Sequence, residues 1–430
     1  MRDLFFEIPI VSAPNSLLKK YKQFLSADLS LANNLVKRKL NSQTIIHVNS
    51  TSCGGGVAEI LKSQIAIEKS LGLDSHWLVI SAPPKFFNIT KKIHNLIQGA
   101  PGNLTKGEKD FYLKINREIG KPFRAYCEKF KKPIIVIHDP QPMPLIEFVP
   151  KDAKCISRLH IDLSTPNLKI MDFLSSFIKK YSLVIVSSPT YIKAIPWPGR
   201  PWIKKSKIIM PAIDPFTEKN IKMKKDVAKS VIQELGINPT KPIISQISRF
   251  DSWKNPLGVI KAYYLAKNKI PELQLVLAGF FQAKDDPEAI SMFKTVKKHA
   301  AGDNDIHLFS ELDQIRDISN DVFINALYTA SSIVIQNSFR EGFGLTMTEA
   351  MWKAKPLIAK KSTGALLQIK NKYNGILISS SEEIANWVAY LLKNKKYATR
   401  LGLNARNSVK KNFLLLHFVL NNLKCYSSLV

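Results

Sequence analysis

Two cations in the second half of the chain have the types and spacing that could neutralise a diphosphate, and two carboxylates follow in a glycine-bearing loop. Arg249 and Lys254 are five residues apart and directly follow an apolar, β-branched run that is typical of a buried strand. Two cations at the carboxyl end of a strand can neutralise a diphosphate from two sides. Glu341 and Glu349 are eight residues apart, in a glycine-bearing loop that turns into a helix. Two structural alternatives stay open: a solvated surface pair of cations, and a capping box formed by Thr346 and Glu349.

Three successive glycines, Gly54, Gly55 and Gly56, lie between an apolar run and a helical pattern in the first half. Glycines at such a turn let backbone amides approach a ligand without interference from side chains, and the N-terminus of the next helix favours negative charge. A tight turn would need only one glycine. The run therefore favours a cradle for a phosphate or a sugar.

Other signatures of catalytic or metal sites are weak or absent. Asp303 and Asp305 have the spacing of a metal-binding Asp-x-Asp pair, but they lie in a turn before a strand, where a polar loop is the better interpretation. The sequence contains no Walker A motif, no serine nucleophile elbow and no Cys-x-x-Cys pair. We therefore expect no metal site.

The elements that position these residues alternate between short apolar strands and longer amphipathic helices, such as 57–71 and 321–328. Parallel strands need crossover connections, so this alternation predicts an α/β fold with parallel sheets wrapped by helices. The expected strands are 44–48, 77–80, 134–137, 155–159, 183–186, 243–247, 273–278, 306–309, 332–335, 357–359 and 375–378.

A stretch rich in proline and glycine at 196–202, followed by Pro211 and Pro215, indicates a boundary near Asp214. We expect two Rossmann-like domains, 1–213 and 214–405, and a C-terminal helix, 406–430, that packs back across them. Ligands bind beyond the carboxyl ends of the strands in such sheets, so the two domains should face a central cleft.

Composition narrows the class of protein. The chain has 430 residues, 45% of them hydrophobic and 23% charged, which is typical of a soluble globular protein. No apolar run approaches the roughly 20 residues of a membrane span, and Asp3, Glu7 and Pro9 interrupt the N-terminus where a signal peptide needs an apolar core. Four widely spaced cysteines suit a reducing compartment, so we expect a cytoplasmic protein.

The net charge is unusual, with 63 Lys and Arg against 34 Asp and Glu, or +29. Scattered lysine pairs favour solvated helix faces, and a weak contact with an acidic membrane stays open. Aromatic residues do not interleave with the basic pairs, so specific nucleic-acid binding is not expected.

Together these segments resemble the retaining GT-B glycosyltransferases of the large family that includes sucrose and glycogen synthases. The resemblance is closer to the trehalose synthases that join a nucleoside-diphosphate glucose to free glucose, and it spans roughly residues 44 to 415. His-Asp-Pro-Gln-Pro at 138–142 and His-Ile-Asp-Leu-Ser at 160–164 point to this subgroup. The other matching segments are 48–60, 210–215 and 340–346.

The resemblance implies that domain 1–213 is on the acceptor side and domain 214–405 on the donor side, and it implies a role for each donor-side residue. Arg249 and Lys254 would bind the diphosphate and stabilise charge on the departing nucleotide. Glu349 would accept hydrogen bonds from the ribose hydroxyls, and Glu341 would hold the transferred glucose. Backbone N–H groups after Glu341 would hold the same glucose, and those at the start of the helix would face the phosphates. These residues are Gly342, Phe343, Gly344, Leu345 and Thr346.

The resemblance also implies roles in the first half. His160 would touch the sugar near its 6-hydroxyl, and the glycines at 54–56 would line the cleft. His138, Asp139 and Asp162 would lie on the acceptor side. The implied catalytic set is Arg249, Lys254, Glu341 and His160.

The implied reaction is retaining transfer on one face of the sugar, with a nucleotide-sugar donor, a small sugar acceptor and no required metal or cofactor. A peripheral membrane glycosyltransferase acting on a lipid or cell-surface glycan is the alternative, and a homodimer stays open. Three positions depart from the family pattern: Asn255 replaces a usual glycine, Thr363 precedes Gly364 where a glycine pair is common, and Cys53 stands where an aromatic is frequent.

Overall fold

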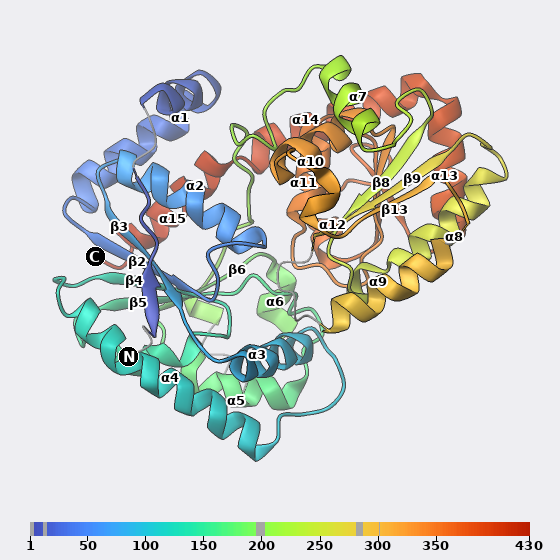
Figure 1. Cartoon of the computed structure of the whole chain (residues 1–430). Coiled ribbons are helices and arrows are strands. Elements are labelled where there is room, and N and C mark those ends of the chain that lie inside the picture. The colour runs from blue at the N-terminus through green and yellow to red at the C-terminus, as the bar shows by residue number, and fades with distance from the viewer. Residues whose placement is uncertain (1–3, 12–14, 195–202, 281–286, 301) are drawn as a thin grey trace. The chain divides into compact units, whose positions relative to one another are not determined.

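The computed structural model describes residues 4–11, 15–194, 203–280, 287–300 and 302–430. The chain forms two compact units, the first made of residues 1–212 and 415–430 and the second of residues 213–414. Each unit contains its own sheet, and helices cover both faces of each sheet (Figure 1). The predicted α/β class with two parallel sheets is confirmed.

The sheet of the first unit has, within the described residues, the strand order β1-β3-β2-β4-β5-β6-β7. Only the outer strand β1 runs antiparallel to its neighbour among these described pairs. The strands are β1 (Phe5–Glu7), β2 (Thr44–Asn49), β3 (Asp74–Ile80), β4 (Ile134–His138), β5 (Lys154–Arg158), β6 (Leu183–Val186) and β7 (Ser206–Ile208). The helices are α1 (Asn15–Lys39), α2 (Gly56–Ser70), α3 (Pro84–Ile97), α4 (Lys106–Cys127), α5 (Leu168–Ile178), α6 (Pro189–Ala194) and α15 (Leu415–Ser427), with 3-10 turns η1 (Met143–Phe148) and η2 (Ile203–Lys205).

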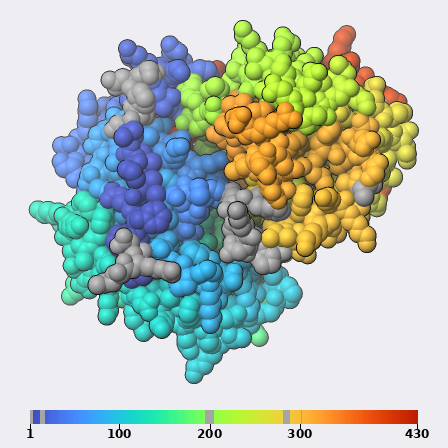
Figure 2. All heavy atoms as spheres, in the orientation of Figure 1, coloured from blue at the N-terminus to red at the C-terminus, as the bar shows by residue number. Residues whose placement is uncertain are grey.

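Burial explains why the central strands are rich in β-branched apolar residues. Every residue of β2 and β4 is buried, as expected for parallel strands that are covered on both faces. Alternate residues of β2, Ile46 and Val48, belong to the core shared with α3, α4 and α5, while α2 packs on the other face with α15 beside it. Strand β1 lies on the outside of this unit, where its dark blue atoms are visible in Figure 2.

The second unit has an all-parallel sheet with the order β10-β9-β8-β11-β12-β13 in the described part of the chain. The strands are β8 (Ile243–Ile247), β9 (Gln274–Ala278), β10 (Ile306–Phe309), β11 (Ile333–Gln336), β12 (Leu357–Lys360) and β13 (Ile376–Ile378). The helices are α7 (Lys225–Glu234), α8 (Pro256–Lys267), α9 (Pro287–Ala300), α10 (Asn320–Ala330), α11 (Leu345–Trp352), α12 (Thr363–Gln368), α13 (Ser381–Lys393) and α14 (Lys395–Asn412), with turns η3 (Ser252–Lys254) and η4 (Leu312–Ile315).

All eleven expected strands are present, and their bounds differ from the expected ones by a few residues at most. The largest difference is at β3, which begins at Asp74 because Thr44 of β2 pairs with it in register. The two short strands β1 and β7 were not expected, since each has three residues and a largely exposed face.

The C-terminal segment is divided between the units. Residues 406–430, expected as one helical segment, comprise the end of α14 in the second unit and the whole of α15 in the first. Helix α15 packs against α1 and α2. Among the described residues, no helix is both long and apolar enough to cross a bilayer.

Candidate functional site

Lys254 and Glu341 form an ion pair at one edge of the second sheet. They follow β8 and β11, which are neighbouring parallel strands, so both lie at the carboxyl ends of those strands. The ammonium Nζ of Lys254 lies 2.6 Å from Oε2 of Glu341, and the two side chains are only 17% and 12% exposed. The backbone N–H of Phe339 donates to the carbonyl of Trp253 over 2.8 Å and ties the two loops together. The structure thus brings two of the expected site residues into direct contact.

Arg249 lies in the same loop but is more exposed. Its side chain is 53% exposed, and Nη2 lies 3.0 Å from Oδ2 of Asp251. The other oxygen of Asp251, Oδ1, accepts a hydrogen bond from the backbone N–H of Lys254 over 3.1 Å. Asp251 therefore holds both cationic residues of the loop. Asp251 was not among the residues predicted from the sequence, although an aspartate three residues before Lys254 is a common helix-capping signal.

Two further donors fix the carboxylate of Glu341. Gln336 Nε2 lies 3.3 Å from Oε2, and the hydroxyl of Ser338 lies 3.4 Å from the same oxygen. Thr346 in turn donates from Oγ1 to Oε1 of Gln336 over 3.2 Å. The end of β11 and the start of α11 therefore orient Glu341 together with Lys254.

The glycine loop before α11 is held in a conformation that side chains resist. Gly344 has a φ of 84° and precedes the first residue of α11, Leu345, as expected. No side chain caps the helix, so the N–H groups of its first turn can bind an anion. The side chain of Phe343 is buried edge-on against Phe413, so this residue offers a ligand only its backbone.

Glu349 is buried within α11 and paired on both oxygens. Oε1 lies 2.7 Å from Nζ of Lys219, and Oε2 accepts a hydrogen bond from the hydroxyl of Tyr328 over 3.2 Å. The capping-box interpretation is wrong, because Gly344 is the capping residue and the hydroxyl of Thr346 bonds to Gln336 instead. Lys219 and Tyr328 were not singled out from the sequence.

Asn255, which replaces the glycine usual in the family, keeps the backbone conformation of the turn after Lys254. It adopts a left-handed conformation with a φ of 48°, which asparagine tolerates better than most residues. Its Oδ1 accepts a hydrogen bond from the backbone N–H of Gly258 over 3.2 Å and caps α8. The substitution for glycine therefore keeps the turn after Lys254.

Replacing Lys353 with methionine is expected to change the pH dependence of stability. Burial lowers the pKa of Lys353 from its ordinary value of 10.5 to about 7, an effect that Glu349 partly opposes. The unfolded chain therefore binds more protons between these pH values, and Lys353 favours folding increasingly as pH rises through them. We expect urea unfolding to show Lys353→Met losing stability relative to wild type from pH 7 to about pH 10. A constant difference, or the same trend in exposed Lys261→Met, would contradict this.

In the first unit, His138 and His160 lie at the carboxyl ends of the adjacent strands β4 and β5. His138 Nδ1 lies 3.0 Å from His160 Nε2, and the rings stack with their centroids 5.3 Å apart. Burial lowers the pKa of both rings well below the ordinary histidine value, and the nearby Arg158 guanidinium adds to this effect. Both rings are therefore neutral.

Asp139 and Asp162 bind the backbone of the same region. Oδ1 of Asp139 accepts from the backbone N–H of His160 over 2.7 Å, and Asp139 has a left-handed φ of 63°. Burial raises the pKa of Asp139 to about 7, although the bond from His160 and the charge of Arg158 oppose the rise. Asp162 Oδ1 accepts from the N–H of Ser164 over 2.8 Å within its own turn. Asp162 therefore shapes the loop after His160.

The glycine run of the first unit has the expected freedom. Gly54 and Gly55 have φ values of 71° and 122°, and Gly56 is the first residue of α2. A Cβ built on Gly55 meets no atom within 4 Å, and no side chain caps α2. More than one glycine is needed for this turn, which excludes the single-glycine interpretation.

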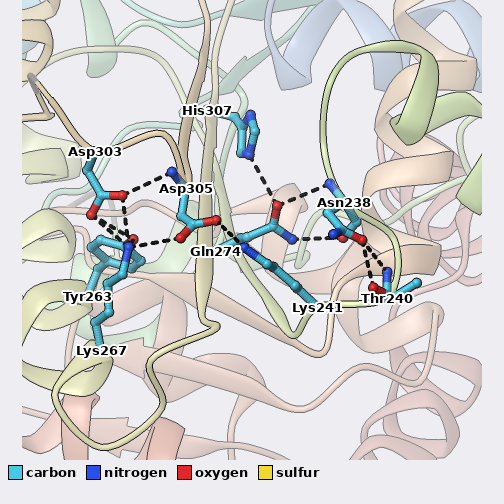
Figure 3. A network of polar contacts seen from close by, with 9 residues as sticks. All are labelled: Asn238, Thr240, Lys241, Tyr263, Lys267, Gln274, Asp303, Asp305 and His307. Atoms are coloured by element: carbon cyan, nitrogen blue, oxygen red, sulfur yellow. Dashed lines mark hydrogen bonds and ion pairs between the residues drawn. The ribbon is translucent and has the colours of Figure 1, made fainter.

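Asp303 and Asp305 belong to a polar network at the opposite edge of the second sheet, before β10 (Figure 3). Nζ of Lys267 lies 2.8 Å from Asp303 Oδ1 and 3.0 Å from Asp305 Oδ2, and Lys241 lies 2.9 Å from Asp305 Oδ1. The hydroxyl of Tyr263 donates to Asp303 over 2.9 Å. Burial opposes ionisation of both carboxyls, but the lysine contacts prevail and lower the pKa of each. The two carboxylates therefore connect the segment before β10 to helix α8 and to Lys241, and we assign them a structural role.

Comparison with known families agrees with this geometry. Residues 47–193 match the family model of the trehalose synthase N-terminal domain, and residues 228–408 match that of glycosyl transferases group 1. The chain is 37% identical to the trehalose synthase of Pyrococcus horikoshii over 415 residues, 96% of each chain. It is 34% identical to that of Rubrobacter xylanophilus over 424 residues, 98% of this chain and 99% of the relative.

A solved structure shares the fold at low sequence identity. The α,α-trehalose-phosphate synthase (UDP-forming) of Burkholderia vietnamiensis superimposes with a TM-score of 0.67 at 13% identity, covering 90% of this chain and 100% of the other. The two parallel sheets and this likeness are those of the GT-B fold. With relatives this similar along nearly its whole length, the chain belongs to the trehalose synthase family of the group 1 glycosyltransferases.

Proposed function

We propose that this glycosyltransferase moves glucose from a nucleoside-diphosphate glucose to free glucose and forms α,α-trehalose with retention of configuration. The observation that carries the proposal is the Lys254–Glu341 pair beside the uncapped start of α11. This arrangement offers cations and backbone N–H groups to a diphosphate, and a carboxylate to a sugar, at one edge of one sheet. The relatives named trehalose synthases support the product.

The donor would bind to the second unit. Arg249 and Lys254 would take the diphosphate, and the backbone of 342–346 would face the phosphates and the glucose. Glu341 would accept hydrogen bonds from glucose hydroxyls. Glu349 would accept hydrogen bonds from the ribose hydroxyls in addition to its contacts with Lys219 and Tyr328, since each carboxylate oxygen can accept more than one hydrogen bond.

The first unit would supply the acceptor side. His160 would contact the sugar near its 6-hydroxyl, and His138, Asp139 and Asp162 would shape the acceptor pocket. The glycines at 54–56 would admit a sugar or phosphate close to the backbone, because no side chain occupies the space over Gly55.

The proposed step proceeds on one face of the glucose. The bond between the anomeric carbon and the β-phosphate oxygen breaks, and the acceptor hydroxyl oxygen bonds to the same face of that carbon. The departing phosphate oxygen takes the acceptor proton, so no protein nucleophile or base is required. Arg249 and Lys254 stabilise the negative charge that develops on the nucleotide.

A donor and acceptor panel tests the proposal. The purified protein is given several nucleoside-diphosphate glucoses with glucose, glucose 6-phosphate or fructose, each with and without excess chelator. We expect trehalose from glucose, and undiminished turnover in chelator because the two cations neutralise the diphosphate. Donor binding without transfer to any of these sugars would contradict the proposal and favour a lipid or glycan acceptor. Loss of turnover in chelator that magnesium or manganese restores would contradict the metal-free step.

A further inference from the structure

A continuous line of hydrogen bonds links His160 to a buried carboxylate. His160 Nε2 lies 3.0 Å from His138 Nδ1, His138 Nε2 lies 3.1 Å from His47 Nδ1, and His47 Nε2 lies 3.2 Å from Oε2 of Glu68. His47 and Glu68 are completely buried and His138 is 4% exposed. These four residues, called here the histidine chain, therefore form a connected polar line that is buried from Glu68 to His138 and ends at the partly buried His160.

Sheet order builds the histidine chain. His47 lies in β2, His138 ends β4 and His160 follows β5, and these three strands are neighbours in the order β2-β4-β5. Glu68 comes from α2, which packs on the face opposite the core that contains Ile46. Strand alternation points His47 away from Ile46 and therefore toward α2.

The carboxylate of Glu68 accepts hydrogen bonds from two neutral side chains, those of Ser75 and Gln64. The hydroxyl of Ser75 donates to Glu68 Oε2 over 2.9 Å, and Gln64 Nε2 donates to Oε1 over 2.7 Å. The second N–H of Gln64 points to the hydroxyl oxygen of Tyr426 at 3.3 Å. Glu68 is thus an acceptor on both oxygens, so His47 must donate to it from Nε2.

The direction of this first bond sets all the others. A neutral imidazole donates from one nitrogen and accepts at the other. When His47 gives its one N–H to Glu68, Nδ1 of His47 accepts from Nε2–H of His138, and Nδ1 of His138 accepts from Nε2–H of His160. The burial that keeps His138 and His160 neutral, with the charge of Arg158 beside them, excludes a doubly protonated ring at either of these two positions.

The remaining ring nitrogen, Nδ1 of His160, is left with a lone pair. Among the described residues it makes no hydrogen bond, while the backbone N–H of His160 is held by Asp139. The ionisable groups next to the three histidines are those of Arg158, Asp139 and Glu68. Among the described residues, none of these three groups forms a hydrogen bond with Nδ1 of His160.

We propose that Glu68, His47 and His138 are positioning residues that hold His160 in one tautomer, with Nδ1 as an acceptor for a substrate hydroxyl. The identity of that hydroxyl as one of a sugar rests on the proposed function. A His160 ring in the other tautomer would present an N–H and could not accept that hydrogen bond. An unmade bond of this kind is worth a loss on the order of 10-fold to 100-fold in kcat/KM.

Nitrogen NMR of ¹⁵N-histidine-labelled protein tests this directly. The two tautomers give distinct ¹⁵N shifts, and each signal is assigned by substituting one histidine at a time with glutamine. We expect His47, His138 and His160 to be protonated at Nε2 and bare at Nδ1 in the wild-type protein. Protonation of His160 at Nδ1 would overturn the proposal, whether or not any variant folds.

Variants at Glu68 test the link to activity. Glu68→Met removes the acceptor, so we expect a mixed tautomer at His160 and a fall in kcat/KM on the order of 10-fold to 100-fold. Glu68→Gln keeps an acceptor oxygen and should restore both. Glu7→Met is the matched control, because it removes the carboxylate 2.7 Å from the partly exposed His76 in the same unit. An unchanged His160 signal and rate in Glu68→Met would overturn the proposal.

The two proposals fail separately. If the wild-type protein forms no trehalose while His160 shows the expected tautomer, the proposed function is wrong and the positioning of His160 stands. If trehalose forms while His160 carries its proton on Nδ1, the positioning is wrong and the proposed function stands.

Discussion

Lys254→Ala is expected to lower kcat by a factor on the order of 10²–10³, comparable to the loss of one donor to a developing anion. The charge on the departing nucleotide grows during transfer, so a cation fixed beside it stabilises the transition state more than the bound donor. Lys254 is fixed by its 2.6 Å contact with Glu341 and by the hydrogen bond that its backbone N–H donates to Asp251 Oδ1. Initial rates at saturating donor and acceptor measure the effect.

The matched control is Lys261→Ala. Lys261 is in the same unit and also forms an ion pair, with Glu382 at 2.6 Å, but both side chains are more than half exposed. Such pairs contribute little to stability, and this one lies in α8 and α13 away from the glycine loop. We expect near wild-type turnover from this variant. Near wild-type turnover from Lys254→Ala as well would remove Lys254 from the diphosphate site.

Gly364→Ala is expected to disable the donor site through the backbone. A Cβ at Gly364 would lie 2.4 Å from the carbonyl oxygen of Phe343, and this neighbour is backbone that cannot rotate away. The N–H of Gly364 also donates to the carbonyl of Glu341 over 2.9 Å. The added methyl must therefore shift the glycine loop, at a cost of about 1–3 kcal/mol in folding free energy. We expect donor affinity to fall at least tenfold in calorimetric titration with a nucleoside-diphosphate glucose, since the same loop offers the N–H groups.

Gly107→Ala is the matched control, because it shows whether any glycine-to-alanine substitution lowers donor affinity. Gly107 is in the first turn of α4, and a Cβ there meets no atom within 4 Å. Alanine favours helix more than glycine does, so this variant should be slightly more stable and bind donor normally. If Gly364→Ala bound donor as tightly as Gly107→Ala, the glycine loop would not contact the donor.

The fold was largely predictable because buried parallel strands leave a strong signal. β6, β8 and β10 have the expected bounds, and each is a run of four or five mostly apolar residues between helical patterns. β1 and β7 carry no such signal because their side chains are mostly exposed. The break between α14 and α15 also went unseen, since Phe413 and Leu414 are apolar residues within a continuous helical pattern.

The candidate site was predictable in its residues but not in its contacts. That Lys254 meets Glu341 depends on β8 and β11 being neighbours, although 87 residues separate the two side chains. Sequence alone does not give this strand order. The Thr346–Glu349 capping box was a reasonable local pattern, but Gly344 occupies the N-cap position without a side-chain cap, and Lys219 pairs with the carboxylate of Glu349.

The histidine chain shows a signal that was available but unused. His47 lies in a strand between the apolar residues Ile46 and Val48, and Glu68 lies on a helix among buried isoleucines. A polar residue inside a fully buried strand needs a hydrogen-bond partner, so His47 and Glu68 were candidates for one another. Only the order of β2 and β4 in the sheet connects them to His138.

The identity and configuration of the product test the central claim, which is retaining transfer of glucose to free glucose. Carbon-13-labelled glucose is incubated with a nucleoside-diphosphate glucose and wild-type protein, and the mixture is followed by NMR. We expect the label in α,α-trehalose, with both anomeric centres in the α configuration and one nucleoside diphosphate released for each trehalose formed. A β-linked disaccharide, or release of the nucleoside diphosphate with only free glucose as product, would contradict that claim.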